Sequence, residues 1–171
     1  MRDESGEPAA LGANLWTTLE HVSEWVRFAD TKAAAVLTVD GILATVLVTV
    51  FGQGHLAHRV AIYLPLGASA VLLVVSAVMC MLCLLPRLTA GPSTNFVYFI
   101  GIAAFPSAAD YFGHIQELAL AGEFDRELAS EIWLRSHAAR TKYRYVRLSL
   151  LTLAAALAGA AAVGVAAIVL D

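Results

Sequence analysis

The sequence predicts an all-α membrane protein: three transmembrane helices, an N-terminal amphipathic helix and a small, mainly helical cytosolic module. Of its 171 residues, 59% are hydrophobic and 15% are charged, whereas soluble domains are nearer one quarter charged. The apolar residues are concentrated in three long blocks, at 33–51, 60–85 and 148–170. Each block is close to the roughly 20 residues that an α-helix needs to cross the hydrocarbon core.

The segment before the first span divides into a tail and a helix. Residues 1–11 are acidic and contain Gly6 and Pro8, so their composition predicts a disordered tail. Residues 12–32 place apolar side chains at alternating spacings of four and three, which predicts a cytosolic amphipathic helix. Nothing breaks this pattern before 33–51, so we expect the helix to continue into the first span.

The distribution of Lys and Arg predicts the orientation. Ten of the 11 Lys and Arg residues lie before the first span or in segment 86–147, and the remaining one, Arg59, lies in the loop between the first two spans. Positive residues favour the cytoplasmic side. We therefore expect the N-terminus and 86–147 to be cytoplasmic and the C-terminus to lie outside.

Segment 86–147 is the candidate sensing module. Its apolar run Asn95–Phe105 is too short to span a bilayer and predicts either one short strand or a buried helix, since periodicity does not separate the two. Ser107 is a good N-cap for a helix at 108–120, and Gly122 ends that helix. From Glu123 the pattern is helical and continues without Gly or Pro into the third span.

The sequence contains no catalytic or metal-binding constellation that we recognise, so we expect a protein that is not an enzyme. Cys80 and Cys83 form a C-x-x-C pattern inside the second span, where lipid disfavours the thiolate that redox or metal chemistry needs. They are better interpreted as small packing residues. His55 and His58 have no carboxylate or thiol beside them in the outer loop.

Asp40 lies within the first span, where a charge costs about 2.5 kcal/mol or more. In a transporter it would belong to an ion pathway. In a small assembly it would form hydrogen bonds with Thr38, Thr45 or a neighbouring helix. Three spans leave little room for a transport pathway in one chain, so we favour a packing or pore-lining role.

The third span carries two small-xxx-small pairs, Ala155–Gly159 and Ala160–Gly164. Such pairs allow helices to approach closely. They fit both self-association and packing within one chain. Because three spans rarely form a large compact unit alone, we expect a homo-oligomer.

Four blocks of the sequence carry a family resemblance: FADTKAAAVLTVDGIL at 28–43, NFVYFIGIA at 95–103, DYFGHI at 110–115 and RSHAARTKYRYVRLS at 135–149. The first block resembles the A-D-x-K-A…D-G signature of the Pycsar transmembrane effector family, and the others are similar to its cytosolic blocks. The resemblance implies a bacterial anti-phage protein of the inner (cell) membrane, encoded beside a pyrimidine cyclase. That cyclase makes cyclic UMP or cyclic CMP on infection. The effector senses the nucleotide and impairs the inner membrane, so that the cell dies before the phage spreads (abortive infection).

With this resemblance, we expect a cyclic pyrimidine nucleotide as the ligand, the lipid bilayer and further copies of the chain as partners, and neither another cofactor nor a nucleic-acid polymer. A cation such as Lys32 or Arg140 would bind the cyclic phosphate, and Tyr98 or Tyr143 would stack on the base. The full set of candidate ligand residues is Asp30, Lys32, Asn95, Tyr98, Arg135, Arg140 and Tyr143. The candidates for the membrane response are Asp40, Gly159 and Gly164.

Two other classes of function remain open from the residues alone. The chain fits a constitutive membrane adaptor or structural protein whose cytosolic helices dock a partner. It also fits a small transporter subunit that uses Asp40. Titration with cyclic nucleotides separates the sensor from both.

Overall fold

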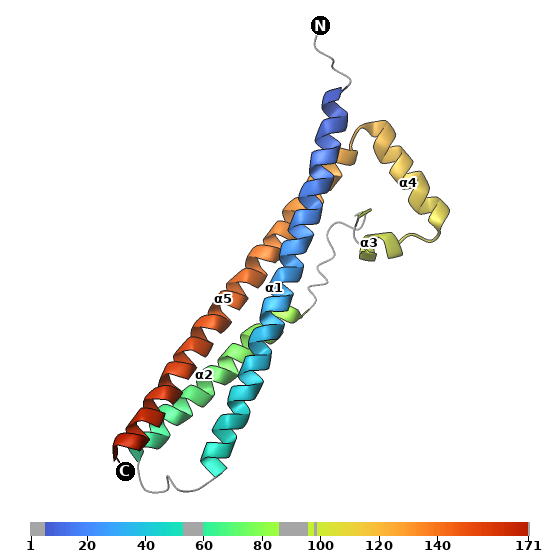
Figure 1. Ribbon diagram of the computed structural model, residues 1–171. Helices are drawn as coiled ribbons and strands as arrows, with labels where there is room; N and C mark the ends of the chain where they lie inside the picture. The colour runs from blue at the N-terminus through green and yellow to red at the C-terminus, as the bar shows by residue number, and fades with distance from the viewer. Residues whose placement is uncertain (1–5, 53–59, 86–95, 98, 171) are drawn as a thin grey trace. The chain divides into compact units, whose positions relative to one another are not determined.

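The protein is all-α, as the sequence predicts. The structure, a computed structural model, describes residues 6–52, 60–85, 96–97 and 99–170. No strand occurs among these residues. They form the five helices labelled in Figure 1: α1 Gly6–Gly52, α2 Val60–Leu84, α3 Phe99–Ala103, α4 Ala108–Ala121 and α5 Phe124–Leu170.

α1 runs without a break from Gly6 to Gly52, so the amphipathic segment and the first apolar block form one helix. It begins inside the 1–11 segment, for which composition predicts a disordered tail. Pro8 lies in the first turn, where the missing N–H has no intrahelical acceptor to lose. Proline therefore allows a helix start that composition alone does not suggest.

Three helices are long and apolar enough to cross a membrane. The candidate segments are Leu11–Thr49 in α1, Leu64–Leu84 in α2 and Phe124–Val165 in α5. α2 contains Pro65 near its start, and proline is tolerated in membrane helices because neighbouring groups satisfy the freed backbone. These lengths and compositions make the chain a membrane protein.

The helices are divided between two compact units. The first unit comprises Met1–Arg27 and Pro86–Arg140, and the second comprises Phe28–Leu85 and Thr141–Asp171. α1 and α5 each contribute residues to both units. The units are described separately below.

The second unit is a bundle of three helices in which α2 runs antiparallel to α1 and α5 (Figure 1). Its core is built from small and aliphatic side chains of all three helices, including Ala33, Leu73 and Ala156. Two close contacts tie α2 to α5. The hydroxyl of Ser76 donates to the backbone oxygen of Ser149 at 3.1 Å, and Gly159 lies against Ser69.

The first unit joins the N-terminal part of α1 to α3, α4 and the start of α5. Its buried side chains include Leu19 and Val22 of α1 and Leu128 of α5. α4 begins where the sequence predicts, because the hydroxyl oxygen of Ser107 accepts the Asp110 backbone N–H at 3.2 Å. It ends at Gly122, whose φ of 70° lies in the left-handed region that favours glycine.

Candidate functional site

A charged cluster lies in the second unit, where the start of its α5 segment meets α1 and the end of α2. The ammonium of Lys142 donates to the Asp30 carboxylate. The Lys142 side chain is only 10% exposed, and that of Asp30 is 36% exposed. A buried ammonium is stable only when it is paired, so Asp30 is the counter-charge that lets Lys142 enter the bundle.

Cys83 supports the same junction. Its thiol lies 3.7 Å from the Lys142 backbone oxygen and 3.9 Å from that of Ala29, which are ordinary distances for a weak S–H donor. Cys80 and Cys83 are both completely buried and form no disulfide. This agrees with their interpretation as small packing residues.

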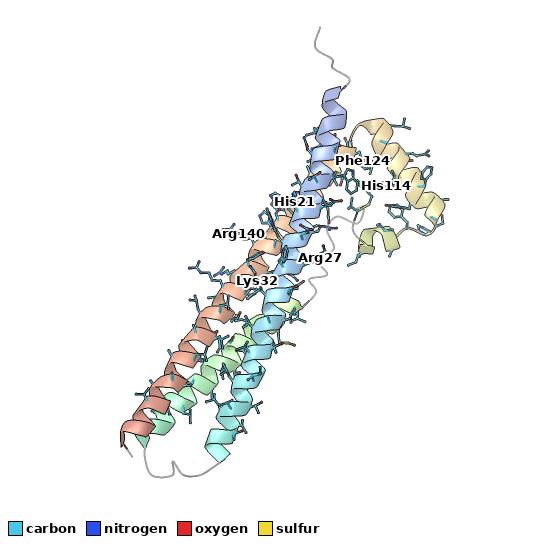
Figure 2. The ribbon with its side chains drawn as sticks, viewed as in Figure 1. His21, Arg27, Lys32, His114, Phe124 and Arg140 are labelled. Atoms are coloured by element: carbon cyan, nitrogen blue, oxygen red, sulfur yellow. The ribbon has the colours of Figure 1, made fainter. Side chains whose placement is uncertain are left out.

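Lys32 is exposed on α1, and Figure 2 labels it on the part of the helix that lies beside α5. Its ammonium lies 5.4 Å from the centroid of the Tyr143 ring. No described carboxylate forms an ion pair with Lys32, so its charge is available to an anion. The Tyr143 ring faces this cation, which is a cation–π geometry.

The cations that the sequence proposes in the first unit differ from each other. Arg135 donates to Glu131 at 2.5 Å and to the hydroxyl of Ser23 at 2.8 Å. Because Glu131 is only 3% exposed, this group joins α5 to α1 and serves the fold. Arg140 is exposed (Figure 2) and forms no ion pair with a described residue. Two further candidates, Asn95 and Tyr98, lie outside the described residues.

The first unit also holds an aromatic pocket of about 270 Å³, lined by Trp16, Phe96, Tyr111 and Phe124 together with aliphatic side chains. The Phe96 and Phe124 ring centroids are 4.8 Å apart, and those of Trp16 and Phe124 are 6.4 Å apart. The Tyr111 hydroxyl donates to the Phe96 backbone oxygen at 2.8 Å. This fixes one wall of the pocket.

Sequence reasoning missed this pocket. Its residues come from α1, the segment before α3, α3 itself, α4 and α5, separated by up to about a hundred positions. The available signal is the aromatic character that these side chains share. Helical periodicity describes each segment alone, however, and does not show that Trp16 and Phe124 meet.

The membrane-response candidates lie in different surroundings. Asp40 is 3% exposed, and neither carboxyl oxygen has a hydrogen-bond partner among the described residues. Thr38 and Thr45 donate to their own helix, to the Ala34 and Gly41 oxygens at 3.0 Å. The bond predicted between Asp40 and these threonines is therefore not formed within one chain.

The two glycines of the third apolar block also differ. A Cβ atom on Gly159 would lie 2.5 Å from the Ser69 hydroxyl oxygen, so the glycine permits close packing of α5 on α2. Gly164 is exposed and faces open space. Within one chain, only Gly159 has the role of a close helix contact.

Comparison with known proteins connects this architecture to one family. The model of the Pycsar effector protein domain matches residues 14–170. A curated protein described as Pycsar effector protein PtPycTM, from Propioniciclava tarda, is 35% identical over 92 residues. That alignment covers 50% of this chain and 45% of the relative, so it spans about half of each protein. No solved structure matches the chain. Because the family model covers nearly the whole chain and both units, the chain belongs to the Pycsar effector family.

Proposed function

We propose that this protein is the membrane effector of a bacterial anti-phage Pycsar system. It senses cyclic UMP or cyclic CMP on its cytosolic side and then impairs the inner membrane, which kills the infected cell. The observation that carries this proposal is the family match over residues 14–170, since it includes both the membrane-type helices and the unit with the aromatic pocket. An adjacent pyrimidine cyclase would supply the signal.

The aromatic pocket is the best candidate for the base. Stacking of a base on aromatic side chains contributes about 1–3 kcal/mol, and the pocket offers four aromatic rings from separate segments. Its volume of about 270 Å³ lies just below the roughly 300–1,000 Å³ of sites for drug-sized ligands. It therefore suits a one-ring pyrimidine base whose sugar and phosphate remain outside.

The cyclic phosphate needs a cation that is not already paired. Lys142 and Arg135 are engaged with Asp30 and Glu131. Lys32 and Arg140 are exposed and form no ion pair among the described residues. Lys32 belongs to the second unit, and Arg140 lies 16 positions after Phe124 on α5, about 24 Å along the helix. Neither cation is therefore assigned to a nucleotide whose base occupies the pocket, and both are tested as a phosphate site independent of it.

The orientation supports access from the cytosol. Ten of the 11 Lys and Arg residues lie before the first apolar block or between the second and third, and the positive-inside rule favours the cytoplasmic side for both segments. A cyclic nucleotide made in the cytosol then reaches the first unit without crossing the bilayer.

Calorimetric titration of the purified chain in detergent tests the sensing step. We expect saturable binding of cyclic UMP or cyclic CMP and much weaker binding of cyclic AMP and cyclic GMP. Trp16→Leu, which alters the pocket, should weaken binding at least tenfold. Trp25→Leu is the matched control, because Trp25 is an exposed tryptophan of the same helix and does not line the pocket.

The outcomes separate the alternatives. The absence of binding by all four nucleotides would contradict sensing and favour a constitutive adaptor. Binding that is equally weakened by both tryptophan variants would contradict the aromatic pocket while keeping the sensor. Release of a trapped dye from vesicles on nucleotide addition then tests the membrane step by itself.

A further inference from the structure

A second cavity lies within the second unit, in a groove between α1 and α2. Its volume is about 550 Å³, and its walls are almost entirely apolar, with Gly41 and Ala44 on α1 and Ala70 and Ala77 on α2. The exception is Asp40, which lines the groove and is 3% exposed. A charged or polar group at this place in a membrane protein is expensive and usually has a function.

Asp40 is a buried carboxyl group that ordinary hydrogen-bond geometry leaves without a partner in the described part of the chain. Both of its carboxyl oxygens are buried without a hydrogen bond among the described residues. The nearby Ser76 hydroxyl gives its hydrogen to the Ser149 backbone oxygen, so toward Asp40 it can act only as an acceptor. Ser76 can serve at most one of the two carboxyl oxygens. Since the bilayer core contains no water that could serve the other, we expect its partner to come from a molecule that enters the groove.

α1 itself presents a matching surface. Small and hydroxyl-bearing residues recur along one exposed face of this helix at spacings of three and four. Small residues at such spacing let a second helix approach closely, and threonine hydroxyls form hydrogen bonds across helices in membranes. This surface, called the α1 seam below, comprises Ala34, Thr38, Gly41, Thr45 and Thr49.

The depth of the seam in the membrane favours a second copy of this chain as the occupant. Copies inserted with the same orientation place equivalent residues at the same depth. Thr38 is two positions from Asp40, which is about 3 Å along a helix axis. A hydroxyl can meet a carboxyl group in either role, because it has one donor hydrogen and two lone pairs. It can therefore accept a bond from a carboxyl group while it still donates to the Ala34 oxygen.

We propose that the α1 seam of one copy packs into the groove of the next, with the Thr38 hydroxyl bonded to the Asp40 carboxyl group. The α1 seam and the groove meet at Gly41, so this contact joins two adjacent but different surfaces of the same protein. Such heterologous contacts repeat and close into a ring when the rotation between copies allows it. The contact does not depend on whether the chain senses a nucleotide.

Cysteine cross-linking of the full chain in membranes tests the contact. Two differently tagged copies are co-expressed, one carrying Ala44→Cys in the groove and the other Thr45→Cys in the seam. The native Cys80 and Cys83 are completely buried and do not compete. The matched control replaces Thr45→Cys with Val46→Cys, which lies at nearly the same depth on another exposed face of α1.

We expect the Ala44→Cys and Thr45→Cys pair to cross-link several-fold more than the control pair. Equal cross-linking of both pairs would overturn the proposal and leave lipid as the occupant of the groove. The absence of cross-linking, both with and without cyclic UMP or cyclic CMP, would overturn it in the same way. Dominant cross-linking between two Ala44→Cys copies would also overturn it, because the groove would then face another groove. None of these outcomes bears on nucleotide affinity.

The bond itself is tested by energy transfer between labelled copies in lipid vesicles. Thr38→Val keeps the shape of the side chain and removes the hydroxyl, so we expect association to weaken about three- to twentyfold, as for other membrane hydrogen bonds. Thr49→Val, in the same seam but nine positions from Asp40, should leave association unchanged. An equal loss in both variants would overturn the Thr38–Asp40 bond.

Discussion

At the scale of single residues, the ion pair between Asp30 and Lys142 explains how a lysine is buried in the bundle. Asp30→Asn removes the counter-charge and leaves the ammonium buried, so we expect a loss of stability of about 1–3 kcal/mol. The partial exposure of Asp30 keeps the effect below that of a fully buried pair. Thermal unfolding in detergent measures it.

Lys142→Met is the control for this prediction. It removes the buried ammonium and keeps an apolar chain of similar length, so it should cost less than Asp30→Asn. Equal unfolding temperatures for Asp30→Asn and the unaltered protein would contradict the role of the pair.

A second residue-scale prediction concerns Gly159. In Gly159→Ala the new Cβ atom would lie 2.5 Å from the Ser69 hydroxyl oxygen, which already donates to the Pro65 backbone oxygen at 3.0 Å. We expect this overpacking to destabilise the protein by about 1–3 kcal/mol. Gly164→Ala should be neutral in the isolated chain, because nothing lies within 4 Å of the new atom.

A second substitution tests whether the stability lost in Gly159→Ala comes from the clash with Ser69 or from a general intolerance of α5 to a larger side chain. Adding Ser69→Ala to Gly159→Ala removes the hydroxyl that clashes, and the Ser69 Cβ atom lies at an acceptable 3.8 Å. Thermal unfolding of the double variant should return close to that of Ser69→Ala alone. If the double variant loses as much stability as the two single variants combined, a clash with the Ser69 hydroxyl does not explain the loss.

At the scale of helices, the turn between α4 and α5 depends on Gly122. Its φ of 70° is strained for any residue with a Cβ atom, so Gly122→Ala should cost about 1 kcal/mol or more. Gly113→Ala is the matched control, since Gly113 lies within α4 with open space around it. It should stabilise α4 by about 0.5–1 kcal/mol. Hydrogen exchange of the α4 amides should therefore accelerate in the first variant and slow in the second.

The sequence predicts the elements well because their signals are local. Ser107 and Gly122 bound α4 through their own capping chemistry, and unbroken periodicity predicts that α1 and α5 continue from polar segments into apolar ones. The apolar run at 95–105 was ambiguous, since a short buried strand and a short buried helix have the same composition. Within it, Phe99–Ala103 form α3, because helix pairing is satisfied within the segment and needs no partner strand.

Contacts between segments that are far apart in the sequence could not be predicted from these local signals. Lys142 lies just before the third apolar block, where local pattern suggests no particular partner, yet it pairs with Asp30, 112 positions away. Helical spacing shows which side chains share a face but not which face of another helix they meet. For the same reason, the sequence identified Lys32 and Arg140 as candidate cations but did not distinguish them from Arg135, whose charge is used within the fold.

At the scale of the whole molecule, the two exposed cations give a prediction about ligand binding. A charge-assisted hydrogen bond to the cyclic phosphate contributes about 1.5–3 kcal/mol, so loss of the correct cation should weaken nucleotide binding about ten- to hundredfold. Lys32→Ala and Arg140→Ala, titrated separately by calorimetry, identify which residue binds it. Neither substitution removes an ion pair among the described residues, so both variants should unfold at an unchanged temperature. Unchanged affinity in both would contradict the assignment of the phosphate site.

Sensing and membrane damage should also be separable, because the aromatic pocket belongs to the first unit and Asp40 belongs to the second. In vesicles that contain the protein and a trapped dye, Trp16→Leu should shift release to nucleotide concentrations at least tenfold higher without lowering its maximum. Asp40→Leu should reduce the maximum and leave the half-maximal concentration nearly unchanged, since it alters the contact between copies and not the pocket. Loss of nucleotide affinity in Asp40→Leu, measured by calorimetry, would contradict this separation and place Asp40 in the sensing step.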